Sequence, residues 1–514
     1  MYLRIRVAKS KCGQSPRRFA HILLLSLASV PIEHLDSTLF SATFARAPHN
    51  ALALLHPPTR VAKSKHLCYT GRMRGPKLPR RWELWAVLLI TGLGAALRIC
   101  CLKDLPPGLH YDEAFKGVMA RGLLEGASPQ LFFQSNMGEE PLAVYLVAAA
   151  LSLFGQQAWI IRLPSAVVGV LTVPLAWWLG RELYDRPKSK PGGHARDGKT
   201  PHSGPVKLVS EDCQASRPPE AKCSLAQFVG LCTALVLAVL YWHVSFSRIG
   251  MEPILVPFTA TLTAAALLRG LNTGRWPAYV LAGLGLGASL YTYKAGYFVP
   301  VLVALFVGYS AVMERRFFRR HWRGLLLSGL VALIVVAPLG FYFVTHPDDF
   351  VHRPASVSLV GGETALDRPW LAIGENVPRV LGMFFLQGDT NPRSNLPGRP
   401  VLDLFLAFLF LVGLGTALAR FNRPRWALPI IWLFVMIVPT IVTEYAPHFA
   451  RAIGAVPAVA LLCGIGVWTL WRGAVGLAKP WLRWGVILFL VAGFAFSTVS
   501  TARAYFHGWK GSPD

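Results

Sequence analysis

Two adjacent carboxylates, Asp112 and Glu113, follow His110 and Tyr111 a few residues after the first long apolar run of the chain. At a membrane–water boundary, where water is partly excluded, a carboxylate acts more strongly on nearby charge than it does in bulk water. One such group could serve as general base for an acceptor hydroxyl, a role that typically contributes ~10²- to 10⁴-fold in rate. The simpler interpretation is a solvated helix start, because Asp caps helices and Glu favours their first turn. The pair alone favours this simpler interpretation.

Several cations occupy short loops that the order of apolar runs places on the same outer side as this pair. Outer basic residues run against the positive-inside tendency, and a charge drawn to the bilayer centre costs up to ~3 kcal/mol. A lipid phosphate would be a natural partner for them. The alternative is that they reach toward ordinary phospholipid head groups. The candidate phosphate-binding residues are Arg248, Lys294, His448 and Arg451.

Further polar and aromatic residues of the outer loops could contact a sugar. They are Tyr111, Tyr293, Asn391 and Arg393. No Asp-x-Asp sequence occurs in the chain, so the usual metal clamp of a nucleotide-sugar enzyme has no obvious ligands. This absence favours a lipid-linked donor. No metal site is assigned from the sequence, and dependence on a divalent metal stays open.

The composition is that of a membrane protein. Of 514 residues, 53% are hydrophobic and only 15% are charged, with a mean hydropathy of +0.43. The net charge of +26 comes largely from Lys and Arg in short loops between apolar runs, such as 315–323 and 420–425. Such loops are retained on the cytoplasmic side, so topology explains the charge better than a nucleic-acid partner does. The eight cysteines show neither a disulfide framework nor zinc spacing.

Twelve apolar runs of roughly 16 to 22 residues predict an all-α, polytopic helical bundle, because such lengths cross a ~30 Å hydrocarbon layer. Basic loops place the N-terminus inside and the 103–139 loop outside, which leaves one crossing for two runs before residue 185. The shorter run, 140–155, is therefore expected to be re-entrant or interfacial, giving eleven crossings. The runs are 82–102, 140–155, 162–180, 226–242, 252–269, 277–292, 296–312, 323–344, 401–419, 427–443, 451–471 and 484–501.

The regions outside these runs differ in character. Residues 1–75 are expected to be a disordered arm: the hexamer RVAKSK occurs in it twice, and Met73 followed by basic residues would make a more ordinary start. The membrane domain is expected to span 76–505. Within it, 185–224 is rich in Pro, Gly, Ser and basic residues and predicts a disordered cytoplasmic linker. The outer loop 346–400 predicts an interfacial helix near 371–386 and then turns.

Four segments carry a resemblance to a known family. They are HYDEAF (110–115), GEEPLAVYL (138–146), FG (154–155) and RLPS (162–165). In this order they resemble the start of the GT-C membrane glycosyltransferases, above all the family 39 group of protein O-mannosyltransferases and lipid A aminoarabinose transferases. The likeness continues through most of 80–505. One departure is the helix start, where Glu139-Glu140-Pro141 stands in place of Lys-Pro-Pro or His-Pro-Pro.

The resemblance implies a plasma-membrane enzyme that moves a sugar, with inversion, from a polyprenyl-phosphate donor to a protein, lipid or glycan hydroxyl on the extracytoplasmic face. It also implies Asp112 as general base, with Glu113 in support. Because the carrier phosphate leaves readily, no acid is needed of the kind that glycosidases use. A lipid or polyprenyl-carrier flippase and a transfer-inactive scaffold of the same fold remain as alternatives. A flippase predicts inverted repeats and mid-membrane charges, which the sequence does not display.

Overall fold

The computed structural model describes residues 79–136, 138–185, 224–360, 368–476 and 479–509. The predicted arm at 1–75 and nearly all of the linker at 185–224 lie outside these residues. The regular structure of the described ranges is helical, and β-structure there is limited to two isolated bridges. The prediction of an all-α fold is confirmed.

Eight helical segments are long and apolar enough to cross a membrane within these ranges. A ninth is the pair α6 (Ser224–Val239) and α7 (Tyr241–Arg248), which is bent by 55°. The eight are built from α2 (Arg80–Ile99), η1 (Ala158–Ile161) with α5 (Leu163–Tyr184), η3 (Glu252–Ile254) with α8 (Leu255–Thr273), η4 (Lys294–Tyr297) with α10 (Phe298–Met313), α11 (Phe317–Thr345), α15 (Pro424–Ile441), α16 (Phe449–Ala452) with η5 (Ile453–Ala455) and α17 (Val456–Gly476), and α18 (Pro480–Arg503) with η6 (Ala504–Gly508).

The remaining two of the eleven predicted crossings contain shorter helices. They are α9 (Trp276–Ser289) and α14 (Leu404–Leu418), of 14 and 15 residues. At ~1.5 Å per residue these helices are about 21 and 22 Å long, which is less than a ~30 Å hydrocarbon layer. All eleven predicted crossings therefore hold a helix, and up to nine of them are full-length spans in the described part of the chain.

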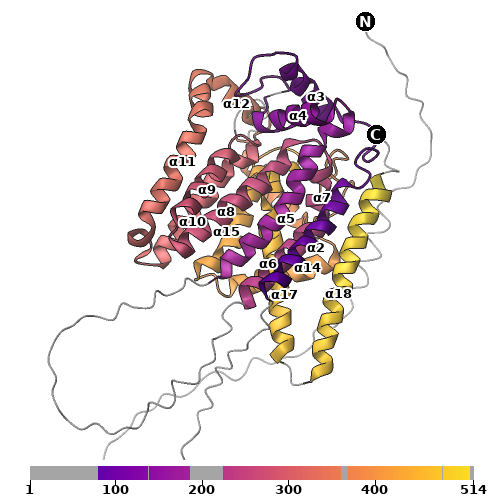
Figure 1. The fold of residues 1–514 in the computed structure, drawn as a ribbon, viewed down its shortest axis with the longest axis vertical. Helices are drawn as coiled ribbons and strands as arrows, with labels where there is room; N and C mark the ends of the chain where they lie inside the picture. The colour runs from indigo at the N-terminus through magenta and orange to yellow at the C-terminus, as the bar shows by residue number, and fades with distance from the viewer. Residues whose placement is uncertain (1–78, 137, 186–223, 361–367, 477–478, 510–514) are drawn as a thin grey trace, which may run out of the picture. The chain divides into compact units, whose positions relative to one another are not determined.

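The centre of the bundle is α17. In the apolar window of its span 83% of residues are buried, against 11% for α11 and 17% for α18. Gly413 of α14 faces the backbone of Leu462, and Gly466 of α17 faces that of Leu409, so close that a Cβ atom would clash at either glycine. Small residues at such a crossing let two backbones approach closely, which replaces the hydrophobic driving force that lipid does not supply. The helices α11 and α18 lie at the periphery (Figure 1).

The bend between α6 and α7 at Leu240 is held by Arg98 from α2. The Arg98 guanidinium donates to the carbonyls of Leu237 and Ala238, each at 2.9 Å, and to His243 Nδ1 at 2.7 Å. A break in a membrane helix frees carbonyl groups that have no water to bind, so another side chain must take them. Helix α7, which follows the break, ends at Arg248, whose side chain donates to the Leu97 carbonyl near the C-terminal end of α2.

Four helices lie at one end of the bundle. They are α3 (Tyr111–Leu124), α4 (Pro141–Phe154), α12 (Pro347–Ala355) and α13 (Pro369–Gly382). Figure 1 shows α3, α4 and α12 together at that end. The run predicted to be re-entrant or interfacial is the 14-residue α4, which packs on α3. The helix predicted near 371–386 is α13, which begins two residues earlier and ends four residues sooner.

Candidate active site

Helix α3 presents the two acidic residues in different ways, because its start is a capping arrangement. Glu113 is fully buried, and its carboxylate accepts from the His110 backbone N–H at 3.0 Å and the Gly250 N–H at 2.6 Å. It also forms an ion pair with Arg162, whose Nε and Nη2 each lie 2.9 Å away. Glu113 therefore has no free acceptor position of the kind a base needs. It ties α3 to the RLPS segment and to the turn after α7.

Asp112 has different partners and keeps a side chain that is 10% exposed. Its carboxylate forms an ion pair with Arg393 and accepts from the side-chain amide of Asn136 at 3.2 Å. His110 Nδ1 lies 3.4 Å from Asp112 Oδ2. Burial, followed by the charge of Arg393, lowers the pKa of His110, which favours the neutral imidazole beside this carboxylate. Asp112 is thus the acidic residue whose surroundings suit a base.

A loop around Asp389 carries Arg393 to this place. The buried Asp389 carboxylate accepts from the N–H groups of Asn391 and Phe449 and from Ser394 Oγ, each at 2.9 Å. Asn391 Oδ1 in turn accepts from the Arg393 N–H at 3.0 Å, the geometry of an Asx turn. Burial raises the pKa of Asp389 despite these donors. Burial also lowers the pKa of Arg393 to about 10, which still leaves it a cation at neutral pH.

A cavity of about 590 Å³ opens between α3 and this loop, a size typical of small-molecule sites. Three prolines, two aromatic rings and two asparagines are among its walls. Asp112 lies beside the cavity, paired with Arg393 of its wall. The lining residues are Pro106, Pro107, Gly108, Leu109, His110, Tyr111, Glu113, Arg162, Ile249, Asn391, Pro392, Arg393, Asn395 and Trp509. Four predicted site residues, Tyr111, Glu113, Asn391 and Arg393, thus share one cavity.

Arg248, predicted to bind phosphate, lies behind the wall of this cavity. It is fully buried, and it donates to the carbonyls of Leu97 at 3.1 Å and Leu105 at 3.3 Å. Its guanidinium carbon sits 4.6 Å from the ring centre of Tyr505. Arg248 is therefore separated from the cavity by the chain segment that follows α2. Pro106, next to its acceptor Leu105, and Ile249, the residue after Arg248, both line the cavity.

The other predicted phosphate ligands lie outside the cavity wall. Lys294 forms a 2.8 Å ion pair with Glu140 at the start of α4. Arg451 donates to the Glu444 carbonyl at 2.6 Å, and its charge acts on Asp389. His448 donates its backbone N–H to Thr440 at 2.8 Å, one residue before the N–H that Asp389 accepts. Tyr293, predicted to contact a sugar, packs against the main core ahead of η4.

One group of residues was not singled out from the sequence. Lys116 Nζ lies 2.7 Å from Glu139 and 2.8 Å from Glu252, and all three side chains are nearly buried. Burial alone would lower the pKa of Lys116, but Glu252 and then Glu139 raise it above its ordinary value. Asn136 joins this group to Asp112, because its amide also donates to Glu139 at 2.7 Å. A signal was present for Lys116, which stands four residues after Asp112 and so on the same face of α3.

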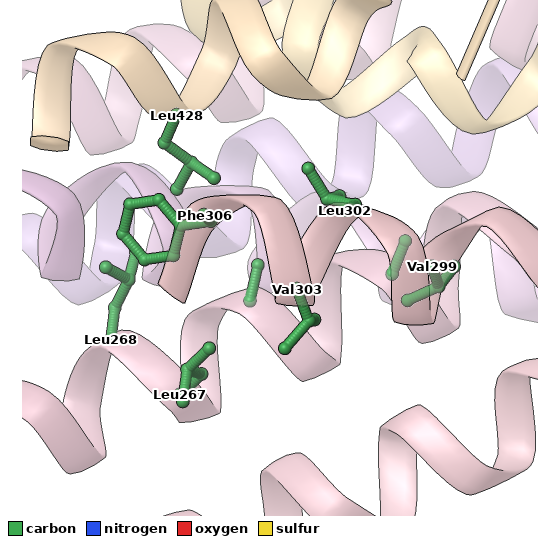
Figure 2. Close-up of a pocket in the computed structure, with 9 residues that line it drawn as sticks. Leu267, Leu268, Val299, Leu302, Val303, Phe306 and Leu428 are labelled. Atoms are coloured by element: carbon green, nitrogen blue, oxygen red, sulfur yellow. The ribbon is translucent and has the colours of Figure 1, made fainter. Parts of the chain in front are cut away.

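Two further hollows among the described residues are lined by apolar side chains. Figure 2 shows a pocket of about 10 Å³ between α8, α10 and α15, lined by apolar side chains such as Leu267, Phe306 and Leu428. That is room for about one water, and without polar partners it is a packing gap. A groove of about 400 Å³ beside Phe421 and Phe434 is also lined by apolar residues. Among the described residues, no three His, Cys, Asp or Glu side chains gather as metal ligands.

Comparison by sequence finds neither a matching family model nor a matching curated protein. Comparison by fold does find similar solved structures. The archaeal oligosaccharyltransferase AglB from Archaeoglobus fulgidus, solved with an inhibitory peptide and a dolichol-phosphate, superimposes with a TM-score of 0.53 at 14% identity. This match covers 84% of the present chain and 56% of AglB, so the chain spans little more than half of that enzyme.

ArnT from Cupriavidus metallidurans, bound to undecaprenyl phosphate, matches with the same TM-score of 0.53 and 14% identity, over 84% of this chain and 76% of ArnT. The apo form of ArnT matches at 0.50 and 15% identity. The fold thus defines a class, the multi-pass helical membrane proteins. Within that class, the chain has the fold of the GT-C membrane glycosyltransferases, as the ordered segments of the sequence predicted.

Proposed function

We propose that this protein transfers a sugar, with inversion, from a polyprenyl-phosphate donor to an acceptor hydroxyl at the outer face of the membrane. The observation that carries the proposal is Asp112, a carboxylate beside a 590 Å³ cavity and paired with Arg393 of its wall. The fold supports it, because AglB and ArnT were both solved with a polyprenyl-type phosphate. The activity, the acceptor and the face of the membrane belong to the proposal.

In this reaction Asp112 accepts the proton of the acceptor hydroxyl as the acceptor oxygen forms a bond to the anomeric carbon. The bond between that carbon and the carrier phosphate oxygen breaks, and polyprenyl phosphate leaves with one more negative charge. Attack from the face opposite the leaving phosphate inverts the anomeric configuration. No acid is required, because the phosphate is a competent leaving group.

The developing charge on the phosphate needs a cation that is already in place. Arg393 suits this role, because it lines the cavity, contacts Asp112 and retains a side chain that is 34% exposed. A planar guanidinium can bind a carboxylate and a phosphate with different N–H groups. Arg248, behind the wall, adds positive potential without direct contact. Lys294 and the pair His448 and Arg451 remain candidates for the carrier in a donor-bound arrangement.

The cavity lining suits a sugar. Tyr111 has an exposed ring that can stack on a sugar, and the nearly buried Trp509 adds an aromatic side chain to the lining. The partly exposed side chain of Asn391 supplies a hydrogen-bonding group at the same wall. Pockets of this kind use a few polar groups to fix orientation within a mostly apolar lining.

The experiment is transfer of label from a panel of radiolabelled polyprenyl-phosphate sugars by membranes that contain the protein. We expect one donor to label a lipid, protein or glycan fraction. Asp112→Asn should lower that transfer by ~10²- to 10⁴-fold while the protein stays folded and inserted. A matched control is Asp348→Asn, an exposed carboxylate of α12.

No incorporation from any donor would contradict the proposal. Equal incorporation by wild type and Asp112→Asn would remove Asp112 from the proposal as its base. Because side-chain cations meet the phosphate in this proposal, we expect treatment with EDTA to leave transfer unchanged. Loss of transfer on chelation and its return with a divalent metal would show that a metal takes part.

A further inference from the structure

A short turn holds Asn136 between two buried carboxylates. Phe133 and Glu139 exchange backbone hydrogen bonds of 3.1 and 2.8 Å across this turn, and the Gly138 N–H donates to the Ser135 carbonyl at 3.2 Å. Asn136 sits in the turn with a φ of 56°, a left-handed conformation that Asn tolerates better than most residues. The turn therefore sets the position of the Asn136 side chain without help from a helix or strand.

The amide of Asn136 uses its nitrogen for two acceptors. It donates to Glu139 Oε1 at 2.7 Å and to Asp112 Oδ1 at 3.2 Å. A primary amide has two N–H groups, so both are engaged. Because both contacts are donated, Asn136 cannot pass a proton between the two carboxylates. It can only hold them in place.

Glu139 is itself fixed from behind. Its other oxygen, Oε2, lies 2.7 Å from Lys116 Nζ, and Lys116 is held 2.8 Å from Glu252 at the start of η3. The Lys116 side chain is 1% exposed, so this group is an anchor inside the protein rather than a surface ion pair. Removing one member of such a buried group changes its charge balance and disturbs the contacts of the other two.

We propose that Asn136, anchored by Lys116, Glu139 and Glu252, is a positioning residue that fixes the orientation of the Asp112 carboxylate. The inference rests on the proposed function, in which Asp112 is the base. Its physical ground is that a misplacement of ~1 Å at a reacting group can cost ~10²-fold in rate. This also gives a role to the Glu-Glu-Pro sequence before α4, where the resemblance leads one to expect a cation. Its first glutamate, Glu139, forms an ion pair with Lys116 of α3.

The groups that face Asp112 come from three directions. Arg393 approaches from the loop around Asp389, His110 precedes α3, and Asn136 comes from the turn before α4. Lys116, Glu139 and Glu252 form a second layer behind Asn136. Removal of Asn136 alone leaves both nearest titratable groups in place, so its effect on Asp112 can be measured separately.

The test uses Asn136→Gly in the full-length protein. Glycine adopts a positive φ freely, so the turn keeps its shape while the amide is lost. We expect kcat to fall ten- to hundredfold and the KM for the acceptor to stay within twofold. Glu139→Ala should behave in the same way, because Asn136 loses its anchor. Glu139→Gln should keep most of the activity, since an amide oxygen still accepts from Asn136.

A second readout does not need activity. A water-soluble carbodiimide modifies protonated carboxyl groups, and peptide mass spectrometry follows the modification of Asp112 against pH. Loss of a donor to the carboxylate should move the labelling midpoint up by about one pH unit in Asn136→Gly. Glu125→Gln, on the exposed face of the same helix, is the matched control and should match wild type in both readouts.

An unchanged labelling midpoint in Asn136→Gly would overturn the inference, as would a rise in KM with kcat unchanged. If wild-type protein transfers no sugar, the proposed function fails, and the labelling midpoint alone still decides whether Asn136 acts on Asp112. The two failures are therefore distinguishable.

Discussion

The carboxylate of Asp112 and the guanidinium of Arg393 form an ion pair, although the two residues come from opposite halves of the chain. Within the proposed reaction this contact joins the base to the cation that meets the carrier phosphate. Loss of Arg393 would leave Asp112 without its counter-ion in a nearly buried place, where an unpaired charge is costly. The pair is thus expected to matter both to the base and to donor binding.

We expect Arg393→Ala to lower kcat/KM for the donor by about 10- to 100-fold, with most of the loss in KM. Arg393→Lys should recover only part of it, because an ammonium cannot bind two anions with a planar fork. Steady-state kinetics with varied donor concentration measures this. Arg379→Ala, at an exposed ion pair on α13, is the control. Arg393→Ala with wild-type kinetics would exclude Arg393 from the donor site.

Glu113 is expected to matter for stability more than for chemistry. Its carboxylate accepts four hydrogen bonds, two of them from Arg162, in a place with no solvent exposure. Removing one partner of a buried ion pair typically costs ~3–5 kcal/mol, so Glu113→Gln should melt at a clearly lower temperature than wild type. The measurement is thermal unfolding of the purified protein in detergent, together with transfer per folded molecule.

Glu375→Gln alters an exposed ion pair, so it should change the free energy of unfolding by less than about 1 kcal/mol. Its melting temperature should therefore stay close to that of wild type. Activity per folded molecule should fall far less in Glu113→Gln than in Asp112→Asn. A normal melting temperature combined with full loss of transfer would instead make Glu113 part of the chemistry.

The Lys116 cluster predicts a pH dependence of stability. One lysine cannot neutralise both Glu139 and Glu252, and burial, followed by the charge of Glu252, raises the pKa of Glu139. A carboxyl group whose pKa is higher in the folded state binds its proton more tightly when folded, so the stability it contributes is lost as pH rises through that folded pKa. Glu139→Gln has no carboxyl group at this position, so it lacks this pH-dependent contribution to stability.

We therefore compare the melting temperatures of Glu139→Gln and wild type in buffers from about pH 5 to about pH 8. The difference, variant minus wild type, should increase as the pH rises. Thermal unfolding across a pH series measures this difference. Glu125→Gln, whose parent carboxylate is exposed, should differ from wild type by a constant amount. A difference for Glu139→Gln that shrinks with pH would mean that Lys116 dominates and lowers the pKa of Glu139.

The sequence could predict which candidate site residues lie at the same end of the bundle, because apolar run length and loop charge fix which end a loop occupies. Those rules brought Tyr111, Asn391 and Arg393 to the region of Asp112, and all three line one cavity. Such rules say nothing of partners. Lys294 was expected at a phosphate and instead pairs with Glu140, an acidic residue that the sequence also displayed as an unusual feature.

The direction in which a side chain points was not predictable from the sequence either. Arg248 ends a short helix whose existence depends on the bend at Leu240, and the bend turns its side chain toward the carbonyl of Leu97. A continuous apolar run does not reveal where a helix will break. Asn136 carried no signal at all, because a single Asn in a turn resembles any other until the fold brings Asp112 to it.

The bend itself gives the last prediction. The five N–H groups of Arg98 all find acceptors: the carbonyls of Gly94, Leu237 and Ala238, Ser247 Oγ and His243 Nδ1. Two of these carbonyls end α6, so Arg98 replaces the helix bonds that the break removes. Its loss would leave buried acceptors unpaired at ~1–3 kcal/mol each. Arg98→Ala should therefore fail to accumulate as folded protein.

Arg98→Lys should accumulate to an intermediate level, because an ammonium offers three donors instead of five. Arg80→Ala, at the exposed start of the same helix, should match wild type. The measurement is the yield of monodisperse protein in detergent and its melting temperature. Since α7 carries Arg248 and leads to the Gly250 N–H that Glu113 accepts, a relaxed bend would also disturb the start of α3. Arg98→Ala with normal yield and melting would show that α6 and α7 hold their bend without this arginine.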